Sequence, residues 1–144
     1  MYRESARAVL RANDRGGYTV PTDRLYPFQW NWDSGFVAMG WATFDEGRGF
    51  REIERLLEGQ WDDGMVPQIV FHAPSDDYFP GPDVWGTRRT PPTSGITQPP
   101  ILATAVRRMW AGACPPGRGR GPCGGPVSAV AGIASLVEAG PRSG

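Results

Sequence analysis

The chain has 144 residues, a length that suits one domain. Its 15 basic and 15 acidic side chains give a formal net charge of zero, so we expect no binding to nucleic acid or to an anionic membrane. No apolar run approaches the roughly 18 residues of a membrane span, and the charged N-terminal stretch lacks the apolar core of a signal peptide. We therefore predict a cytoplasmic protein and leave its oligomeric state open.

Metal and cofactor sites are not predicted. The two cysteines, Cys114 and Cys123, lie near the C-terminal end, and His72 is the single histidine. Two cysteines do not make a disulfide framework, and one histidine leaves few ligands for zinc. The sequence also has no Ser-His-Asp order and no phosphate-binding glycine loop.

The composition changes near Trp110. All sixteen aromatic residues (6 Trp, 4 Tyr and 6 Phe) and fourteen of the fifteen acids lie at or before this position. The 34 residues after it include nine Gly and five Pro, and only one acid, Glu138. We therefore divide the chain into a folded region, 1–110, and a Gly/Pro/Ala/Arg-rich tail, 111–144, which is predicted to be disordered. Two interpretations of the tail are open: a flexible extension, or out-of-frame translation of a gene rich in G and C.

The first two predicted helices cover about residues 4–12 and 34–44. The segment RGGYTVPT ends the first helix with a glycine pair and a proline. The second follows a cap supplied by Asp33 or Ser34. It has almost no polar face, which predicts burial on all sides.

The stretch YPFQWNWDSGF, residues 26–36, leads into the second helix. It places an aromatic residue at every second position: Tyr26, Phe28, Trp30 and Trp32. In an extended chain these rings share one face, which suits a core. The same rings also suit the C–H faces of a sugar, with hydrogen bonds to its hydroxyls from Gln29, Asn31 and Asp33.

The third helix is predicted over about residues 48–60 and the fourth over about 99–110. The third has an apolar stripe that includes Phe50 and Ile53, and an opposite face that is predicted to be solvated: Arg51, Glu52, Glu54, Arg55 and Glu58. The fourth follows Thr97 as a plausible cap and has two prolines in its first turn.

A long connection, about residues 61–96, joins these two helices. Connections of this length are uncommon unless they have a function. A short strand is expected at 69–71, and His72 follows it. Asp76 and Asp77 are adjacent, point apart and suit a solvated turn, while the surrounding Pro and Gly suggest a shaped loop that closes as a lid. Gln98 lies after this connection and faces either its own helix or a pocket.

Four motifs occur in order along the chain: YPFQWNWDSGF, GQWDDGMVPQIVFH, YFPGPDVWGT and SGITQPP. Together they resemble the mannosylglycerate hydrolase-like members of glycoside hydrolase family 63, over about residues 5–110. The resemblance implies an all-α fold, in which this chain supplies only the N-terminal helices of an (α/α)6 barrel. It also implies hydrolysis of an α-linked hexose from a small acid such as glycerate, with inversion at the anomeric carbon.

The resemblance implies the substrate-binding residues as well. The wall of the sugar subsite corresponds to these five residues: Tyr26, Gln29, Trp30, Trp32 and Asp33. Gln98 is implied as a further contact to the sugar. His72 and Tyr78 are implied as parts of a mobile loop that closes over the substrate.

The resemblance ends at Trp110. An inverting glycosidase needs an acid and a base about 6.5–9.5 Å apart, and in the family both come from the barrel beyond SGITQPP. We therefore predict no catalytic residue in this chain. The final GIASLVEAGPRSG resembles the stretch leading to the family's acid, but no Asp follows it, which favours the frame disruption.

We accordingly predict a fragment of an inverting glycosidase that is poorly folded and inactive alone. Four helices cannot close the barrel, and each large side chain left exposed forgoes about 1.5–3 kcal/mol. The alternatives are a non-catalytic carbohydrate-binding remnant, a protein-interaction module that uses the Pro and aromatic loops, and an inert pseudogene product.

Overall fold

The structure, a computed structural model, describes residues 2–113. Its helices are α1 (Tyr2–Ala12), α2 (Asn31–Ala42), α3 (Glu46–Leu57), α4 (Pro82–Trp85) and α5 (Leu102–Ala113), and its strands are β1 (Gln29–Trp30) and β2 (Ile69–Val70). The predicted all-α class is confirmed, and α4 was not predicted. The tail predicted to be disordered lies outside the described residues from 114 onward.

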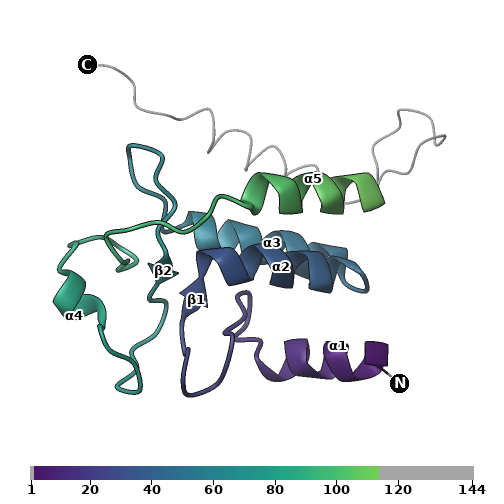
Figure 1. Ribbon diagram of the computed structural model, residues 1–144, viewed down its shortest axis with the longest axis horizontal. Helices are drawn as coiled ribbons and strands as arrows, with labels where there is room; N and C mark the ends of the chain where they lie inside the picture. The colour runs from purple at the N-terminus through teal and green to yellow at the C-terminus, as the bar shows by residue number, and fades with distance from the viewer. Residues whose placement is uncertain (1, 114–144) are drawn as a thin grey trace.

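Helices α2 and α3 form the centre of the fold. They run antiparallel, with α5 along one side of the pair and α1 on the other (Figure 1). The core between α2, α3 and α5 contains these buried residues: Ala38, Phe50, Ile53, Leu57 and Met109. Gly49 allows the close approach of α2 and α3, because a Cβ there would lie 2.8 Å from the carbonyl oxygen of Ala38. None of the helices in the described range is long and apolar enough to cross a membrane.

The start of α2 corrects the sequence prediction. The helix begins at Asn31, and Trp30 occupies the N-cap position without a side-chain cap. Asp33 and Ser34 therefore lie within the first turn rather than at the cap. The expected burial on all sides is also wrong, because Phe36 is 51% exposed. The other described elements leave the side of α2 that carries Trp32 and Phe36 uncovered.

Helix α3 confirms the apolar stripe but not the whole solvated face. Glu52 is completely buried, although it lies among residues predicted to face solvent. The physical reason is that β1 and the segment before it cover this side of the helix, where Gln29 and Thr19 bond to the carboxylate. On the exposed part of this face, Arg55 pairs with Glu58 at 2.7 Å.

Helices α1 and α5 also differ from prediction. No residue of α1 is buried, and Val9 is 59% exposed. Helix α5 begins at Leu102 and continues to Ala113, past the predicted end. Thr97 does not cap α5, because its hydroxyl donates to the carbonyl of Val66 at 2.6 Å.

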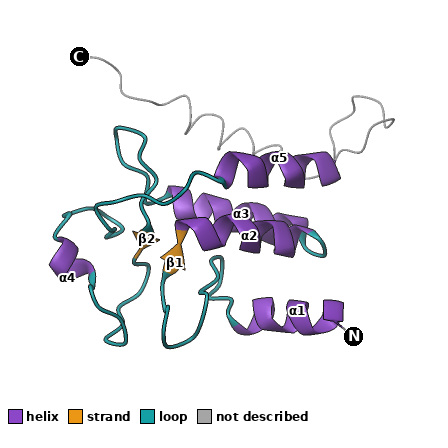
Figure 2. Cartoon of the chain, in the orientation of Figure 1, coloured by secondary structure: helices purple, strands orange, loops and turns teal. Residues whose placement is uncertain are grey.

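Strands β1 and β2 form a two-stranded antiparallel sheet, with Gln29 opposite Val70 and Trp30 opposite Ile69. The predicted short strand near residue 69 is thereby confirmed. The sheet, α4 and the long loops gather at one end of the helices, where α2 and α5 begin and α3 ends (Figure 2). This loop-rich end holds the candidate site.

Candidate functional site

An aromatic cluster lies where β1 meets the segment after β2. The ring of Trp30 packs edge-on against Tyr78 at 5.2 Å and Tyr26 at 5.4 Å between centroids. Phe28 stacks on Trp30 at 6.0 Å and meets Tyr78 edge-on at 5.9 Å. Phe28 and Trp30 are buried, whereas Tyr26 is 47% exposed. The ring of Tyr26 is therefore exposed to solvent on one side and packed against Trp30 and Tyr78 on the other.

The first turn of α2 carries a second exposed ring. Trp32 is 38% exposed and packs edge-on against Phe36 at 5.2 Å. Its backbone N–H donates to Oε1 of Gln98 at 2.9 Å. Gln98 therefore satisfies one of the free N–H groups at the helix start, which is the role the sequence suggested for Asp33 or Ser34.

Asp33 lies beside Trp32 in the same turn and is half-buried. Burial raises the pKa of its carboxyl, and a hydrogen bond from its own backbone N–H opposes this increase. The N-terminal end of α2 also favours a negative charge there. The position offers a hydrogen-bonding carboxylate next to an aromatic face.

Gln29 lies behind the aromatic cluster and is completely buried. Its Nε2 donates to Oε1 of Glu52 at 3.0 Å and to the backbone carbonyl of Glu52 at 2.8 Å. Its Oε1 lies 2.7 Å from Nε2 of His72. Both ends of the amide are thus occupied by protein groups.

Glu52 is a buried polar centre that the sequence prediction missed. It accepts hydrogen bonds from Gln29, from Ser34 Oγ at 2.8 Å, and from the N–H and hydroxyl of Thr19 at 3.2 and 2.9 Å. Arg48 adds an ion pair at 3.0 Å. Burial raises the pKa of the Glu52 carboxyl, and Arg48, Ser34 and Thr19 oppose that increase. The only sequence signal was the four-residue spacing of Arg48 and Glu52, which exposed helix pairs share.

Arg48 extends this polar centre to the segment after α1. It pairs with Asp14 at 2.9 Å and lies over the ring of Trp41 at 4.8 Å. Burial acts to raise the pKa of Asp14, but Arg48 and the backbone N–H groups of Gly16 and Gly17 hold it below its usual value. The segment before β1 is thereby fixed to α3.

His72 lies between Gln29 and Arg55. Its Nδ1 is 3.4 Å from Nη2 of Arg55, and its ring lies 4.4 Å from that of Tyr18. Burial and the nearby Arg55 charge lower the pKa of His72 to about 4. The imidazole is therefore neutral at pH 7. Asp76 and Asp77, further along the segment, are exposed as the solvated-turn prediction requires.

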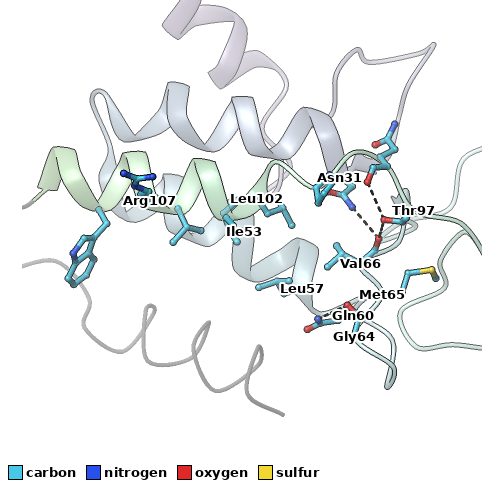
Figure 3. Close-up of a pocket in the computed structure, with 15 residues that line it drawn as sticks. Asn31, Ile53, Leu57, Gln60, Gly64, Met65, Val66, Thr97, Leu102 and Arg107 are labelled. Atoms are coloured by element: carbon cyan, nitrogen blue, oxygen red, sulfur yellow. Dashed lines mark hydrogen bonds between the residues drawn. The ribbon is translucent and has the colours of Figure 1, made fainter. Parts of the chain in front are cut away.

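A cavity of about 720 Å³ opens between α3 and α5 (Figure 3). Its walls are mainly aliphatic, from Ile53, Leu57, Leu102 and Val106, with Trp110 at the far end of α5. The polar lining consists of Arg107 on α5 and four residues at the loop-rich end: Asn31, Gln60, Thr97 and Gln98. We call this the apolar groove.

The structure thus separates the predicted site residues into two sets. Gln29 and Trp30 are buried, and the partly buried His72 is joined to Gln29 by a hydrogen bond. The other set has exposed or half-buried side chains: Tyr26, Trp32, Asp33, Tyr78 and Gln98. Within residues 2–113, no group of three or more His, Cys, Asp or Glu side chains is placed to hold a metal ion.

Comparison with known sequences places the chain among glycoside hydrolases. The profile of the "Mannosylglycerate hydrolase MGH1-like glycoside hydrolase domain" matches residues 26–121. Mannosylglycerate hydrolase MGH1 from Selaginella moellendorffii is 55% identical over 107 residues, which are 74% of this chain and 22% of that protein. The mannosylglycerate hydrolase of Thermus thermophilus is 56% identical over 105 residues, which cover 71% of this chain and 25% of that protein. The glucosylglycerate hydrolase of Mycolicibacterium hassiacum is 46% identical over 114 residues, which cover 73% of this chain and 26% of that protein.

Solved structures give the same result. A GH63 mannosylglycerate hydrolase from Thermus thermophilus, in complex with Tris and D-glycerate, matches with a TM-score of 0.81 at 46% identity. The match covers 96% of this chain and 32% of that one. The complex of the same enzyme with glucose matches with a TM-score of 0.72 at 44% identity, and the match covers 97% of this chain and 32% of that one. The chain therefore spans about a quarter of the length of its sequence relatives and a third of the solved chains.

Proposed function

The chain belongs to the mannosylglycerate hydrolase MGH1-like glycoside hydrolase family, and we propose that it supplies the sugar-binding wall of such an enzyme. The substrate class is an α-hexosyl glycerate, bound at the loop-rich end of the helices. Residues 1–110 correspond in this proposal to the first helices of an (α/α)6 barrel. The acid and the base of an inverting mechanism come from the part of the barrel that this chain does not span.

The exposed groups at the start of α2 are the observation that carries this proposal. Trp32 and Tyr26 present aromatic faces of the kind that pack on the C–H face of a pyranose. Asp33 and Gln98 lie next to Trp32 and offer a carboxylate and a carboxamide to vicinal hydroxyl groups. Two further residues, Gln29 and Trp30 on β1, support the proposed wall from behind. The loop that follows β2 contributes His72 and Tyr78.

The apolar groove does not suit a sugar. Its aliphatic walls offer few donors or acceptors, so burying hexose hydroxyl groups there leaves them without hydrogen bonds. The start of α2 instead combines an exposed aromatic ring, Trp32, with hydrogen-bonding groups from Asp33 and Gln98. We therefore assign the sugar to the start of α2.

The carboxylates of the described residues do not suggest an acid–base pair. Glu52 is occupied by its five donors, and Asp62 is paired with Arg89 at 3.2 Å. Asp33 is half-buried beside an aromatic ring, where binding the sugar is its proposed role. We propose no catalytic residue, and we expect no hydrolysis of a hexosyl glycerate by the purified chain.

A non-catalytic sugar-binding protein is the second candidate function. This function needs only the proposed wall. Its support is that Trp30 and Gln29, next to the exposed groups, are buried and that Gln29 is hydrogen-bonded to Glu52. The protein-interaction hypothesis is less well supported, because Phe28, Trp30 and Trp41 are buried against the fold rather than displayed.

Calorimetric titration of the purified chain with mannosylglycerate and glucosylglycerate tests the proposal. We expect saturable binding that Trp32→Ala weakens about tenfold or more, because the variant loses the stacking face. Trp110→Ala is the matched control: Trp110 is 43% exposed but lies at the apolar groove, so its loss leaves the affinity unchanged. Equal losses in both variants, or no binding by a chain that unfolds cooperatively, would contradict the proposed wall.

A further inference from the structure

A chain of four polar side chains, of which Glu52 and Gln29 are completely buried, runs beneath the aromatic cluster. It starts at Glu52 on α3, passes through Gln29 on β1 and His72 after β2, and returns to Arg55 on α3. The successive contacts are 3.0 Å, 2.7 Å and 3.4 Å. Three segments distant in sequence are therefore joined by one hydrogen-bonded path.

The chemistry of the two ends gives this path a direction. A carboxylate only accepts hydrogen bonds and a guanidinium only donates them. The carboxylate and the main-chain carbonyl of Glu52, at 3.0 and 2.8 Å, both require the NH₂ end of Gln29, which turns Oε1 of Gln29 toward His72. His72 must then donate from Nε2, and its bare Nδ1 accepts from Arg55. The structure fits a single imidazole tautomer, with the proton on Nε2.

The surroundings of Glu52 support the carboxylate form that this direction needs. The N–H of Thr19, the NH₂ of Gln29 and the guanidinium of Arg48 all point at its oxygens. None of these three groups can accept a proton from it. Among the described residues, Arg55 is the charged group that contacts His72, and Gln29 and the ring of Tyr18 contact it as well.

The path also reaches the proposed wall from both sides. Gln29 precedes Trp30 in β1, and His72 begins the segment that carries Tyr78. Tyr78 in turn packs against Trp30 and Tyr26. Fixing the amide of Gln29 against the imidazole of His72 therefore sets how the two sides of the cluster meet.

We propose that Glu52 is a positioning residue for the sugar wall. Its carboxylate acts together with its main-chain carbonyl to orient Gln29, which fixes the Nε2–H tautomer of His72 and holds β1 in register with the segment from His72 to Tyr78. The effect on sugar binding rests on the proposed function above. The effect on His72 does not, so the two are tested separately.

The single histidine makes a direct test possible. In ¹⁵N-labelled full chain without sugar, long-range ¹H–¹⁵N correlation reports which imidazole nitrogen carries the proton. We expect Nε2–H in the wild type and a larger Nδ1–H fraction in Glu52→Gln, because only the main-chain carbonyl of residue 52 then still fixes the direction of Gln29 as a pure acceptor. Glu54→Gln on the same helix is the matched control and should leave the wild-type tautomer.

A second variant separates the two ends of the path and does not depend on the folding of Glu52→Gln. In Arg55→Gln, we expect the pKa of His72 to rise toward its ordinary value, while Nε2–H persists in the neutral ring because Glu52 still orients Gln29. A wild-type Nδ1–H tautomer overturns the proposal. So does a tautomer unchanged in a folded Glu52→Gln, or one that switches in Arg55→Gln.

Sugar titration then links the path to the wall. Folded Glu52→Gln should bind the hexosyl glycerate about tenfold more weakly than the wild type, as expected for the loss of a charge-assisted positioning bond. Unchanged affinity in a variant with mixed tautomers overturns the positioning role. If the wild type shows the expected tautomer but binds no sugar, the orientation by Glu52 stands and the proposed function alone fails.

Discussion

Glu52 and Ile53 are neighbours on α3, and neither is more than 1% exposed, yet they face opposite environments. Ile53 belongs to the aliphatic core shared with α2 and α5 and borders the apolar groove. Glu52 belongs to a hydrogen-bonded region shared with β1 and the segment before it. One helix therefore separates an apolar side from a polar side that supports the proposed wall.

The difference shows how each side specifies the structure. The apolar side depends on volume and close approach, as at Gly49, and tolerates other apolar shapes at modest cost. The polar side depends on matching donors with acceptors, because an unpaired buried group is costly. Substitutions on the two sides should therefore differ in size and in kind.

The largest effect is expected for Glu52→Ala. Removing the carboxylate leaves Arg48, whose side chain is 10% exposed, with fewer partners and leaves the buried backbone N–H of Thr19 without its acceptor. We expect the free energy of unfolding to fall by about 3–5 kcal/mol, measured by urea denaturation. Glu54→Ala is the control and should cost less than about 1 kcal/mol. A small loss in Glu52→Ala would remove the distinction between the two sides.

Ile53→Ala should have the next largest effect. Losing a buried aliphatic side chain costs about 2–5 kcal/mol, and the lower part of that range applies because Ile53 borders an open groove. The same denaturation measurement checks it. Val9→Ala on α1, where Val9 is 59% exposed, should change stability by less than about 1 kcal/mol. A loss in Ile53→Ala no larger than in Val9→Ala would show that the apolar side is not packed.

Acid should act on the polar side through His72. Its pKa is lowered from 6.5 to about 4, so between these values the unfolded chain binds more protons than the folded chain. Stability is therefore retained above pH 6.5 and lost as the pH falls toward 4. Relative to His72→Gln, the wild type should lose about 1–3 kcal/mol over this window, a range reduced because the ring is partly exposed.

Comparing the two proteins isolates the imidazole. The raised pKa of Glu52 acts in the opposite direction, favouring the folded state as its carboxyl protonates, but it is common to both proteins. Parallel stability curves for wild type and His72→Gln between pH 7 and 4 would show that His72 is not held neutral by the fold.

The smallest effect is expected at the exposed edge of the polar side. Glu58 pairs with Arg55 at 2.7 Å, but their side chains are 45% and 34% exposed. Glu58→Gln should therefore cost about 0.5 kcal/mol or less at low salt and nothing measurable at high salt. A loss as large as that of Ile53→Ala would mean that Arg55 depends on Glu58 to hold the path to His72.

The helices were predictable because their apolar residues repeat at helical spacing, as Phe50, Ile53 and Leu57 do on α3. The helix starts were less predictable. Residues far away in sequence satisfy the first N–H groups of α2, with Gln98 bonding to Trp32. Because Gln98 is 66 residues from Trp32, the sequence next to the start of α2 does not reveal this hydrogen bond.

The sequence by itself determined the family and the helical class, because four motifs and helical periodicity follow one another along the chain, and the same motifs predict the residues of the candidate wall. Only the tertiary structure decided which of those residues are buried, and that Glu52 lies beneath them rather than in solvent. The physical reason is that a charged residue on a helix looks the same in sequence whether it meets water or buried donors. The fold brings Thr19, Gln29 and Ser34 to Glu52 from other segments and thereby makes its burial possible.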